Sequence, residues 1–298
     1  MKLSIVIVNY NCRDFLLSCL QKLAEFIGES KDYEVFVVDN NSRDGSAKAV
    51  AEKFPWVNLI ANDRNLGFAR ANNQALKLAR GEYILLLNPD TEVPPETLEK
   101  VLRYMDERQE IGGLTCRVEL ADGSLDPACH RGFPTPGAAI SYFLGLEKLF
   151  PKSRLFGRYH ITWENLKKPH EIDSPSGCFF LFRREVLERV GYLDEDYFLY
   201  GEDVDFAFRM KKNGYKIIFY PEVKIIHYKG VSSGVKKSSA QVTTADEETR
   251  RLAIRSFYQA NWLFYQKHFA SRYPFFLNWL FRFGIWLLEK KSLLSKRI

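Results

Sequence analysis

Two carboxylates that follow apolar runs are the residues in this chain best suited to chemistry. Asp90 closes the tripeptide Asn88-Pro89-Asp90 after five residues that favour burial, and Asp39 follows a second apolar run. A carboxylate at a strand end can bind a divalent cation together with a substrate phosphate. It can also accept hydrogen bonds from a ribose hydroxyl or from the N3–H of uracil or thymine. An ordinary turn at Asn88–Asp90 and a helix cap or Asx turn at Asp39 also fit these residues.

The tripeptide has the form of an Asp-x-Asp metal motif with Asn in its first position. Mg²⁺ and Mn²⁺ prefer oxygen ligands and commonly take one or two carboxylates plus substrate phosphates. One Asp and a neutral Asn bind a cation more weakly than two carboxylates, so we expect a further protein ligand. His227, at the end of the apolar segment 223–226, is the candidate. Mixed sites occur, but a lone His at a strand end is more often structural.

Three acids, Glu202, Asp203 and Asp205, open a segment with helical spacing. One of them is a candidate general base that removes a proton from an acceptor hydroxyl. The helix dipole alone also favours acids at a helix start. At 100° per residue, Asp203 and Asp205 lie about 200° apart, so at most one of them is expected to face a substrate.

The elements that position these residues alternate along the first part of the chain. We expect strands at 3–8, 34–38, 57–61, 83–87, 178–182, 216–220 and 223–227, and helices at 15–26, 46–54, 68–78, 94–107, 184–190 and 202–213. Strands that alternate with helices predict βαβ units and a parallel sheet, with 83–87 as a central strand. Asn9, Asp39 and Asp90 then share one rim. Proline-punctuated residues 121–176 predict an irregular region, such as a lid or acceptor surface.

Composition and motifs exclude several classes of protein. Five cysteines without a CxxC pair argue against a disulfide framework and a zinc knuckle, and they fit a reducing compartment. Neither a GxGxxG dinucleotide motif nor a P-loop is present. We expect no signal peptide, because an apolar strand follows Met1 almost at once. We expect no membrane-spanning helix, because no apolar stretch reaches about 18 residues.

The C-terminal tail differs from the rest of the chain. Residues 249–298 contain ten Lys/Arg and one Glu, whereas residues 1–248 carry a net charge of −3. Thirteen aromatic residues lie within 256–288. This composition is typical of an interfacial amphipathic element attracted to anionic lipid. An oligomerisation helix pair and a helix packed on the domain are the alternatives. Long apolar runs disfavour nucleic-acid binding.

Six segments, in their order and spacing, resemble the inverting glycosyltransferases of family 2, in the rhamnosyltransferase-like branch. They are VIVNYN at 6–11, VVDNNSRDGS at 37–46, NLGFARANN at 65–73, LLNPDT at 86–91, SGC at 176–178 and GEDVD at 201–205. Each segment alone is a weak or moderate signal, but their order is specific. The resemblance covers roughly residues 1–230.

The resemblance implies an α/β fold of the glycosyltransferase A type, with a mostly parallel central sheet flanked by helices. It implies donor contacts from Val8, Tyr10, Asp39, Arg70, Asn88 and Asp90, a Mg²⁺ or Mn²⁺ ion bound by Asp90 and His227, and Asp203 as catalytic base. Transfer would be a single displacement with inversion, which needs no covalent nucleophile. Asn88 departs from the strict motif and leaves the identity of the metal open.

We divide the chain into a catalytic domain, residues 1–240, and a helical tail, residues 241–298. We expect a cytoplasmic enzyme, peripheral at the inner face of the membrane through its tail, that acts on a UDP- or dTDP-sugar. The acceptor would be a glycan or lipid-linked glycan in cell-surface polysaccharide synthesis, and rhamnose is one candidate sugar. A homo-oligomer and a catalytically degenerate nucleotide-sugar-binding protein stay open. A nucleotidyltransferase is disfavoured, because no glycine- and basic-rich phosphate loop follows Val8.

Overall fold

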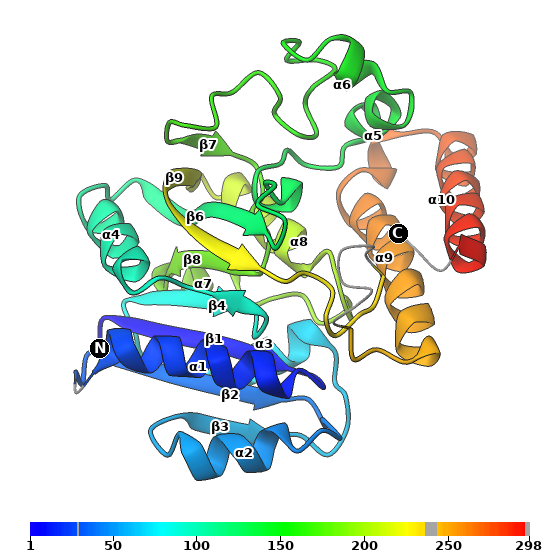
Figure 1. The fold of residues 1–298 in the computed structure, drawn as a ribbon. Coiled ribbons are helices and arrows are strands. Elements are labelled where there is room, and N and C mark those ends of the chain that lie inside the picture. The colour runs from blue at the N-terminus through cyan, green and yellow to red at the C-terminus, as the bar shows by residue number, and fades with distance from the viewer. Residues whose placement is uncertain (29, 236–242, 296–298) are drawn as a thin grey trace.

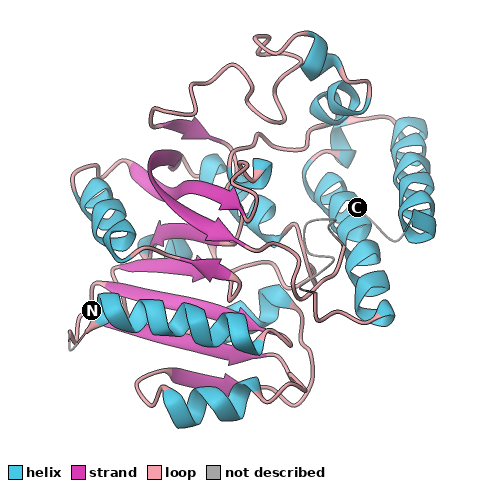
Figure 2. Cartoon of the chain, viewed as in Figure 1, coloured by secondary structure: helices cyan, strands magenta, loops and turns pink. Residues whose placement is uncertain are grey.

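The computed structural model describes residues 1–28, 30–235 and 243–295 (Figure 1). Within these residues, one nine-stranded sheet has the strand order β3-β2-β1-β4-β8-β6-β9-β5, and β7 pairs with β9. Helices α1 and α4 lie in front of the sheet in the view of Figure 2, and two C-terminal helices stand at one side. The proposed domain boundary at residues 240–241 lies outside the described residues.

The first half of the sheet is the predicted parallel unit. Its strands are β1 (Leu3–Asn9), β2 (Tyr33–Asp39), β3 (Asn58–Ala61) and β4 (Tyr83–Leu87), connected by α1 (Arg13–Ile27), α2 (Ser46–Lys53) and α3 (Phe68–Leu76). Every residue of β1 and β4 is buried, as expected for strands covered on both faces. The register places Asn9 opposite Asp39 and Ile7 opposite Leu87, so the carboxyl ends of β1, β2 and β4 form one rim.

The second half of the sheet is mixed, which corrects the expectation of parallel neighbours on both sides of β4. Its strands are β5 (Thr91–Glu92), β6 (Ile111–Leu120), β7 (His170–Ile172), β8 (Phe179–Arg183) and β9 (Lys216–His227). Strand β8 runs antiparallel to both β4 and β6, while β9 runs parallel to β6 and antiparallel to β5 and β7. The two strands predicted at 216–227 are one strand. A register shift opposite Cys116 and Arg117 accommodates Pro221, which cannot donate to the ladder.

The remaining helices cover the sheet and its carboxyl edge. They are α4 (Pro95–Asp106), α7 (Glu185–Val190), α8 (Glu202–Lys212), α9 (Glu247–His268) and α10 (Phe275–Ser295). The region predicted to be irregular contains only short elements besides β7: η1 (Pro127–Cys129), α5 (Pro136–Phe143) and α6 (Leu146–Leu149). Helix α9 packs on the sheet-containing part of the chain, where Phe264 contacts Phe133 and Phe208. No helix among the described residues is long and apolar enough to cross a membrane.

Helix α3 begins where two segments far apart in sequence meet. Gly67 has φ +85°, and a Cβ atom there would lie 2.5 Å from the carbonyl oxygen of Phe198. The Phe68 amide donates a hydrogen bond to that same oxygen at 2.6 Å. Only glycine therefore allows the start of α3 to approach the loop that leads into α8.

We predict that Gly67→Ala destabilises the fold by about 1–3 kcal/mol more than Gly191→Ala. Gly191 is the matched control, because its φ of +82° and ψ of −178° are close to the +85° and 170° of Gly67. The nearest atom to a Cβ placed at Gly191 is Arg209 Nη1, at an ordinary contact distance of 3.9 Å. Both variants carry the same backbone strain, and only Gly67→Ala adds the clash. Urea unfolding of the two variants measures the difference, and equal losses would contradict the tight contact.

Candidate active site

Asp39 lies on the rim formed by the ends of β1 and β2. Its Oδ1 accepts a hydrogen bond from Asn9 Nδ2 at 2.8 Å, and its Oδ2 accepts one from the Ser42 amide at 2.9 Å. The side chain is buried. The hydrogen bond from the Ser42 amide is that of an Asx turn, which the sequence also allowed at Asp39. Each oxygen of the Asp39 carboxylate can still accept a second hydrogen bond. Val8, which is buried, and Tyr10, which is partly exposed, flank Asn9 in the chain.

Asp90 and His227 lie side by side at the ends of β4 and β9. His227 Nε2 is 3.3 Å from Asp90 Oδ1 and 3.4 Å from Asn88 Nδ2. Both side chains are about 5% exposed. Burial would lower the pKa of His227, but Asp90, Cys178 and Asp126 together raise this pKa well above its ordinary value. The Asp90 carboxylate and the protonated His227 imidazole thus form a buried ion pair.

This cluster fits a divalent cation that is shared with substrate. It offers a carboxylate, an imidazole nitrogen and an amide side chain, donors that mixed sites use. Among the described residues, no group of three or more His, Cys, Asp or Glu side chains is arranged to bind a metal. Two protein ligands leave several positions for phosphate oxygens and water, which is the usual arrangement for Mg²⁺.

Asp126 lies behind His227 and was not identified from the sequence. It is fully buried, with Oδ2 3.5 Å from His227 Nδ1 and Oδ1 2.5 Å from Lys229 Nζ. Neither Asp126 Oδ2 nor His227 Nδ1 has a hydrogen-bond partner within the described residues. Burial would raise the pKa of Asp126, but His227 and Lys229 lower it. A carboxylate here favours a proton on Nδ1 and leaves Nε2 facing Asp90.

Asp203 lies in the first turn of α8 and is firmly oriented. Its Oδ2 accepts hydrogen bonds from Arg131 Nη2 at 2.9 Å and from the Gly177 amide at 3.0 Å. Asp205 points elsewhere, to Arg209 and His268, each at 2.7 Å. The two acids thus diverge, as helical spacing predicts.

The segment 176–178 connects Asp203 to the Asp90 cluster. Its Gly177 amide binds Asp203, and the Cys178 carbonyl oxygen accepts a hydrogen bond from the Asn88 amide at 3.1 Å. The structure therefore brings the expected metal ligands and the expected base to one edge of the sheet. Arg70 is more than half exposed and lies 3.6 Å from Glu195. Within the described residues, Arg70 forms no hydrogen bond or ion pair with the other expected site residues.

Arg131 and Glu202 complete the surroundings of Asp203. Burial would lower the pKa of the Arg131 guanidinium, but Asp203, Tyr159 and Asp126 together raise that pKa. Burial and the charge of Asp203 raise the pKa of Glu202 to about 8. Glu202 Oε2 has no hydrogen-bond partner in the described part of the chain. Arg131 lies in the region predicted to be irregular, where no sequence pattern marks it.

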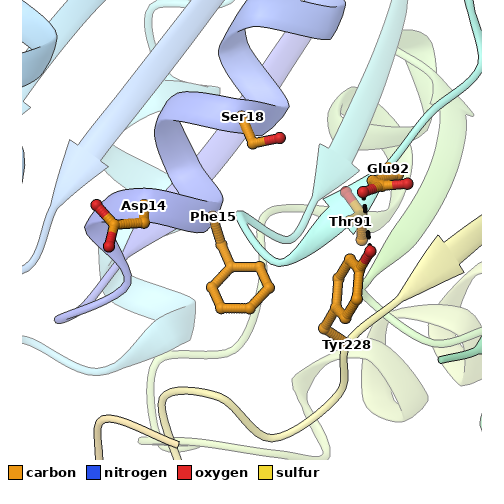
Figure 3. A pocket seen from close by; sticks show the side chains of 6 residues that line it. All are labelled: Asp14, Phe15, Ser18, Thr91, Glu92 and Tyr228. Carbon is orange, nitrogen blue, oxygen red and sulfur yellow. Dashed lines mark hydrogen bonds between the residues drawn. The ribbon is translucent and has the colours of Figure 1, made fainter. Parts of the chain in front are cut away.

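A pocket of about 200 Å³ adjoins the site between α1 and β5 (Figure 3). Six residues line it: Asp14, Phe15, Ser18, Thr91, Glu92 and Tyr228. The Phe15 and Tyr228 rings lie 5.1 Å apart, and the Tyr228 hydroxyl donates to Glu92 at 2.8 Å. None of the expected site residues lines it, although Thr91 and Tyr228 directly follow Asp90 and His227. It lies beside the Asp90 cluster.

Comparison with known proteins adds an independent observation. The family model described as glycosyl transferase family 2 matches residues 4–191. The N-acetylglucosaminyl-diphospho-decaprenol L-rhamnosyltransferase of Mycobacterium tuberculosis strain H37Rv is 27% identical over 245 residues, which cover 78% of each chain. Rhamnosyltransferase WbbL of Escherichia coli K12 is 25% identical over 233 residues, or 75% of this chain and 82% of WbbL.

The crystal structure of GalNAc-T7 with UDP, GalNAc and Mn²⁺ has a TM-score of 0.58 to this structure. The match has 15% identity and covers 86% of this chain and 47% of that one. Identity this low shows a shared fold alone. The family match ends before Asp203 and His227, so their roles depend on the geometry described above.

We predict that Glu202→Gln flattens a decline of stability that the wild-type chain shows between about pH 5 and pH 8. The raised pKa means that the unfolded chain releases this proton near the ordinary glutamate value while the folded chain retains it to about pH 8. Stability therefore falls as pH rises through this window. Urea unfolding between pH 5 and pH 8, taken as about the limits of that window, measures the slope. Glu52→Gln, at an exposed helix position, is the control and should retain the wild-type slope. A wild-type slope in Glu202→Gln would contradict the assignment.

Proposed function

Because the chain belongs to glycosyl transferase family 2, we propose that it transfers a sugar from a UDP- or dTDP-sugar to an acceptor hydroxyl with inversion. The glycosyltransferase A-type fold predicted from the sequence is confirmed, with a mixed sheet. The observation that carries the proposal is the junction at 176–178. There one short segment holds Asp203 on one side and Asn88, next to the Asp90–His227 pair, on the other.

Asp39 is the proposed contact to the nucleotide base. Its carboxylate is held by Asn9 and Ser42, and its free acceptor positions suit the N3–H of uracil or thymine. Val8 and Tyr10 would lie against the base, and Arg70 remains a proposed donor contact after leaving Glu195. The UDP in the GalNAc-T7 structure supports a uridine nucleotide as a ligand of the shared fold.

Asp90 and His227, with Asn88 beside them, would hold Mg²⁺ or Mn²⁺ against the donor diphosphate. Such an ion, when bound, neutralises charge that develops on the leaving diphosphate. Asp126, which is itself paired with Lys229, would favour a proton on His227 Nδ1 and leave Nε2 toward Asp90. The GalNAc-T7 structure contains Mn²⁺, which supports this proposal for the fold.

Asp203 is the proposed base. It takes the proton of the acceptor hydroxyl as that oxygen attacks the anomeric carbon from the face opposite the diphosphate. The bond between the anomeric carbon and the diphosphate oxygen breaks, and its electron pair leaves with the diphosphate. Arg131 and the Gly177 amide fix the carboxylate in place, so little reorganisation is needed in the transition state.

The acceptor is proposed to be a lipid-linked or cell-surface glycan, with rhamnose as one candidate sugar. The relatives named as rhamnosyltransferases support this, and the Mycobacterium tuberculosis name includes a decaprenol diphosphate carrier. Helix α10 supports peripheral contact with the inner face of the membrane. One side of it packs on α9, where Phe281 lies 4.9 Å from Tyr265 between ring centroids.

The opposite side of α10 exposes a stripe of large apolar residues beside Arg282, Lys290 and Lys291. The stripe consists of Phe275, Phe276, Trp279, Leu280, Phe283, Trp286 and Leu287. A helix that is apolar all round is normally buried, and a large exposed apolar surface marks an interaction site. The exposed side of α10 therefore indicates contact with a second surface besides α9. The basic residues favour an anionic lipid surface as that partner. A helix pair between two copies of the chain is the alternative.

We predict that Asp203→Asn lowers kcat by at least about a thousandfold, in the range of general-base loss, while donor binding persists. Glu202→Gln tests the neighbouring acid and should retain most of the rate. Transfer is measured from labelled donor, and donor binding by calorimetry. Full activity in Asp203→Asn would end the assignment, and loss only in Glu202→Gln would move the base to Glu202.

We predict that Asp90→Asn weakens Mn²⁺-dependent binding of UDP by about ten- to a hundredfold, because one of two protein ligands loses its charge. His227→Ala should act in the same direction. Calorimetric titration of UDP with Mn²⁺, and again with chelator, separates metal-linked binding from the rest. Glu92→Gln, in the adjoining pocket, is the matched control and should bind as wild type. Equal affinity of wild type with and without Mn²⁺ would contradict metal dependence.

A further inference from the structure

A second exposed apolar surface lies on α5, α6 and the turn that follows, and the proposed chemistry does not use it. We define the α5–α6 patch as Ile140, Phe143, Leu144, Leu149, Phe150 and Leu155, each at least 52% exposed. Single exposed apolar residues are common on soluble proteins, whereas a group of this kind marks an interaction surface. These residues lie within a segment of sixteen residues.

The charges around the patch are almost all positive. Six exposed cationic side chains lie within residues 147–168: Lys148, Lys152, Arg154, Arg158, Lys167 and Lys168. Glu147 and Glu164 are the acids of the same segment. Glu147 is buried and paired with His160 at 2.9 Å, so it does not offset the surface charge. Apolar side chains within a basic border complement an anionic lipid surface, where each nearby Lys or Arg contributes about 1 kcal/mol.

The α5–α6 patch and α10 are connected through one aromatic cluster. Phe133 precedes α5 by three residues and lies 6.4 Å from Phe264 between ring centroids. Phe264 lies 5.8 Å from Phe269, and α10 begins six residues after Phe269. At about 3.5 Å per residue at most, both helices start near one aromatic cluster. In the view of Figure 1, α5 and α10 both lie toward the upper right of the molecule.

We propose that the α5–α6 patch and α10 together bind the surface of an anionic bilayer, with the patch as a second, separate contact. The proposal rests on the membrane contact of α10 proposed above. Helices α5 and α6, with eight and four residues, are too short to span a membrane and would lie in its interface. Two weak contacts on one body bind far more tightly than either alone.

The placement has a consequence for the acceptor. Arg131, which holds Asp203, precedes α5 by five residues. A bilayer against the α5–α6 patch therefore lies on the Asp203 side of the site. A lipid-linked acceptor anchored in that bilayer reaches the proposed base without leaving the membrane surface.

Vesicle co-sedimentation of the full chain tests the proposal, with phosphatidylglycerol-containing vesicles against pure phosphatidylcholine vesicles. The patch variant is Phe143→Ser with Leu149→Ser and Phe150→Ser. We expect it to bind the anionic vesicles at least about tenfold more weakly than wild type, with wild-type thermal stability. The control, Trp56→Ser with Leu78→Ser, removes exposed apolar residues elsewhere and should bind as wild type.

The result that overturns the proposal is wild-type vesicle binding by the patch variant. A change of the patch variant from dimer to monomer in light scattering, with no change in vesicle binding, would also overturn it and assign the patch to a second copy. The α10 variant Trp279→Ser with Phe283→Ser is measured in parallel and reports the α10 contact separately. Because no donor or acceptor is present in the assay, its outcome is independent of whether the chain transfers sugar.

Discussion

The burial of Asp90 against His227 is the constraint on which the rest of the structure depends. An unpaired carboxylate at 5% exposure would be costly, so this site requires a positive partner at all times. In the structure the partner is the imidazole, supported from behind by Asp126 and Lys229. Strand β5, which directly follows Asp90, pairs with the end of β9 and so fixes Asp90 beside His227. Asp90 and His227 would hold a divalent cation without an unpaired charge, since the cation would supply the positive charge that the imidazolium proton supplies in its absence.

The same principle of charge pairing organises the side of the site that contains Asp203. Asp203 is paired with buried Arg131, and the pair is coupled to the Asp90 cluster through the backbone at 176–178. Glu202 is the exception, because it is buried beside Asp203 without a hydrogen-bond partner for Oε2 in the described residues, and its pKa rises accordingly. Ion pairs and the backbone hydrogen bonds at 176–178 thus hold Asp203 and the Asp90–His227 pair in a fixed arrangement. The exposed apolar residues of α5, α6 and α10 lie outside this arrangement of charged groups. They form the surfaces that we propose to contact a bilayer.

The sequence predicts the first half of the fold well, because buried parallel strands are continuous apolar runs that end in polar residues. Strand β4 is predicted to the residue for this reason. Strand β6 escapes notice because Gly112 and Gly113 interrupt its apolar run, and Pro221 makes β9 read as two strands. The insertion of antiparallel β8 beside β4 has no local signal, because strand order depends on contacts between distant segments.

The site shows the same division. Asp39 and Asp90 are marked by their position after apolar runs, and the family resemblance assigns Asp203 and His227. Arg131 and Asp126 act through partners 72 and 103 residues away, namely Asp203 and Lys229. No spacing rule connects such pairs, so only the folded structure identifies them.

The location of Mn²⁺ in a crystal soaked with UDP tests the central claim most directly, since anomalous scattering identifies the ion itself. The account predicts one Mn²⁺ bound by the Asp90 carboxylate and His227 Nε2, with oxygens of the UDP diphosphate completing its coordination. The uracil ring of the same UDP molecule should lie against the Asp39 carboxylate. Mn²⁺ and UDP bound elsewhere, with the Asp90–His227 pair intact, would contradict it.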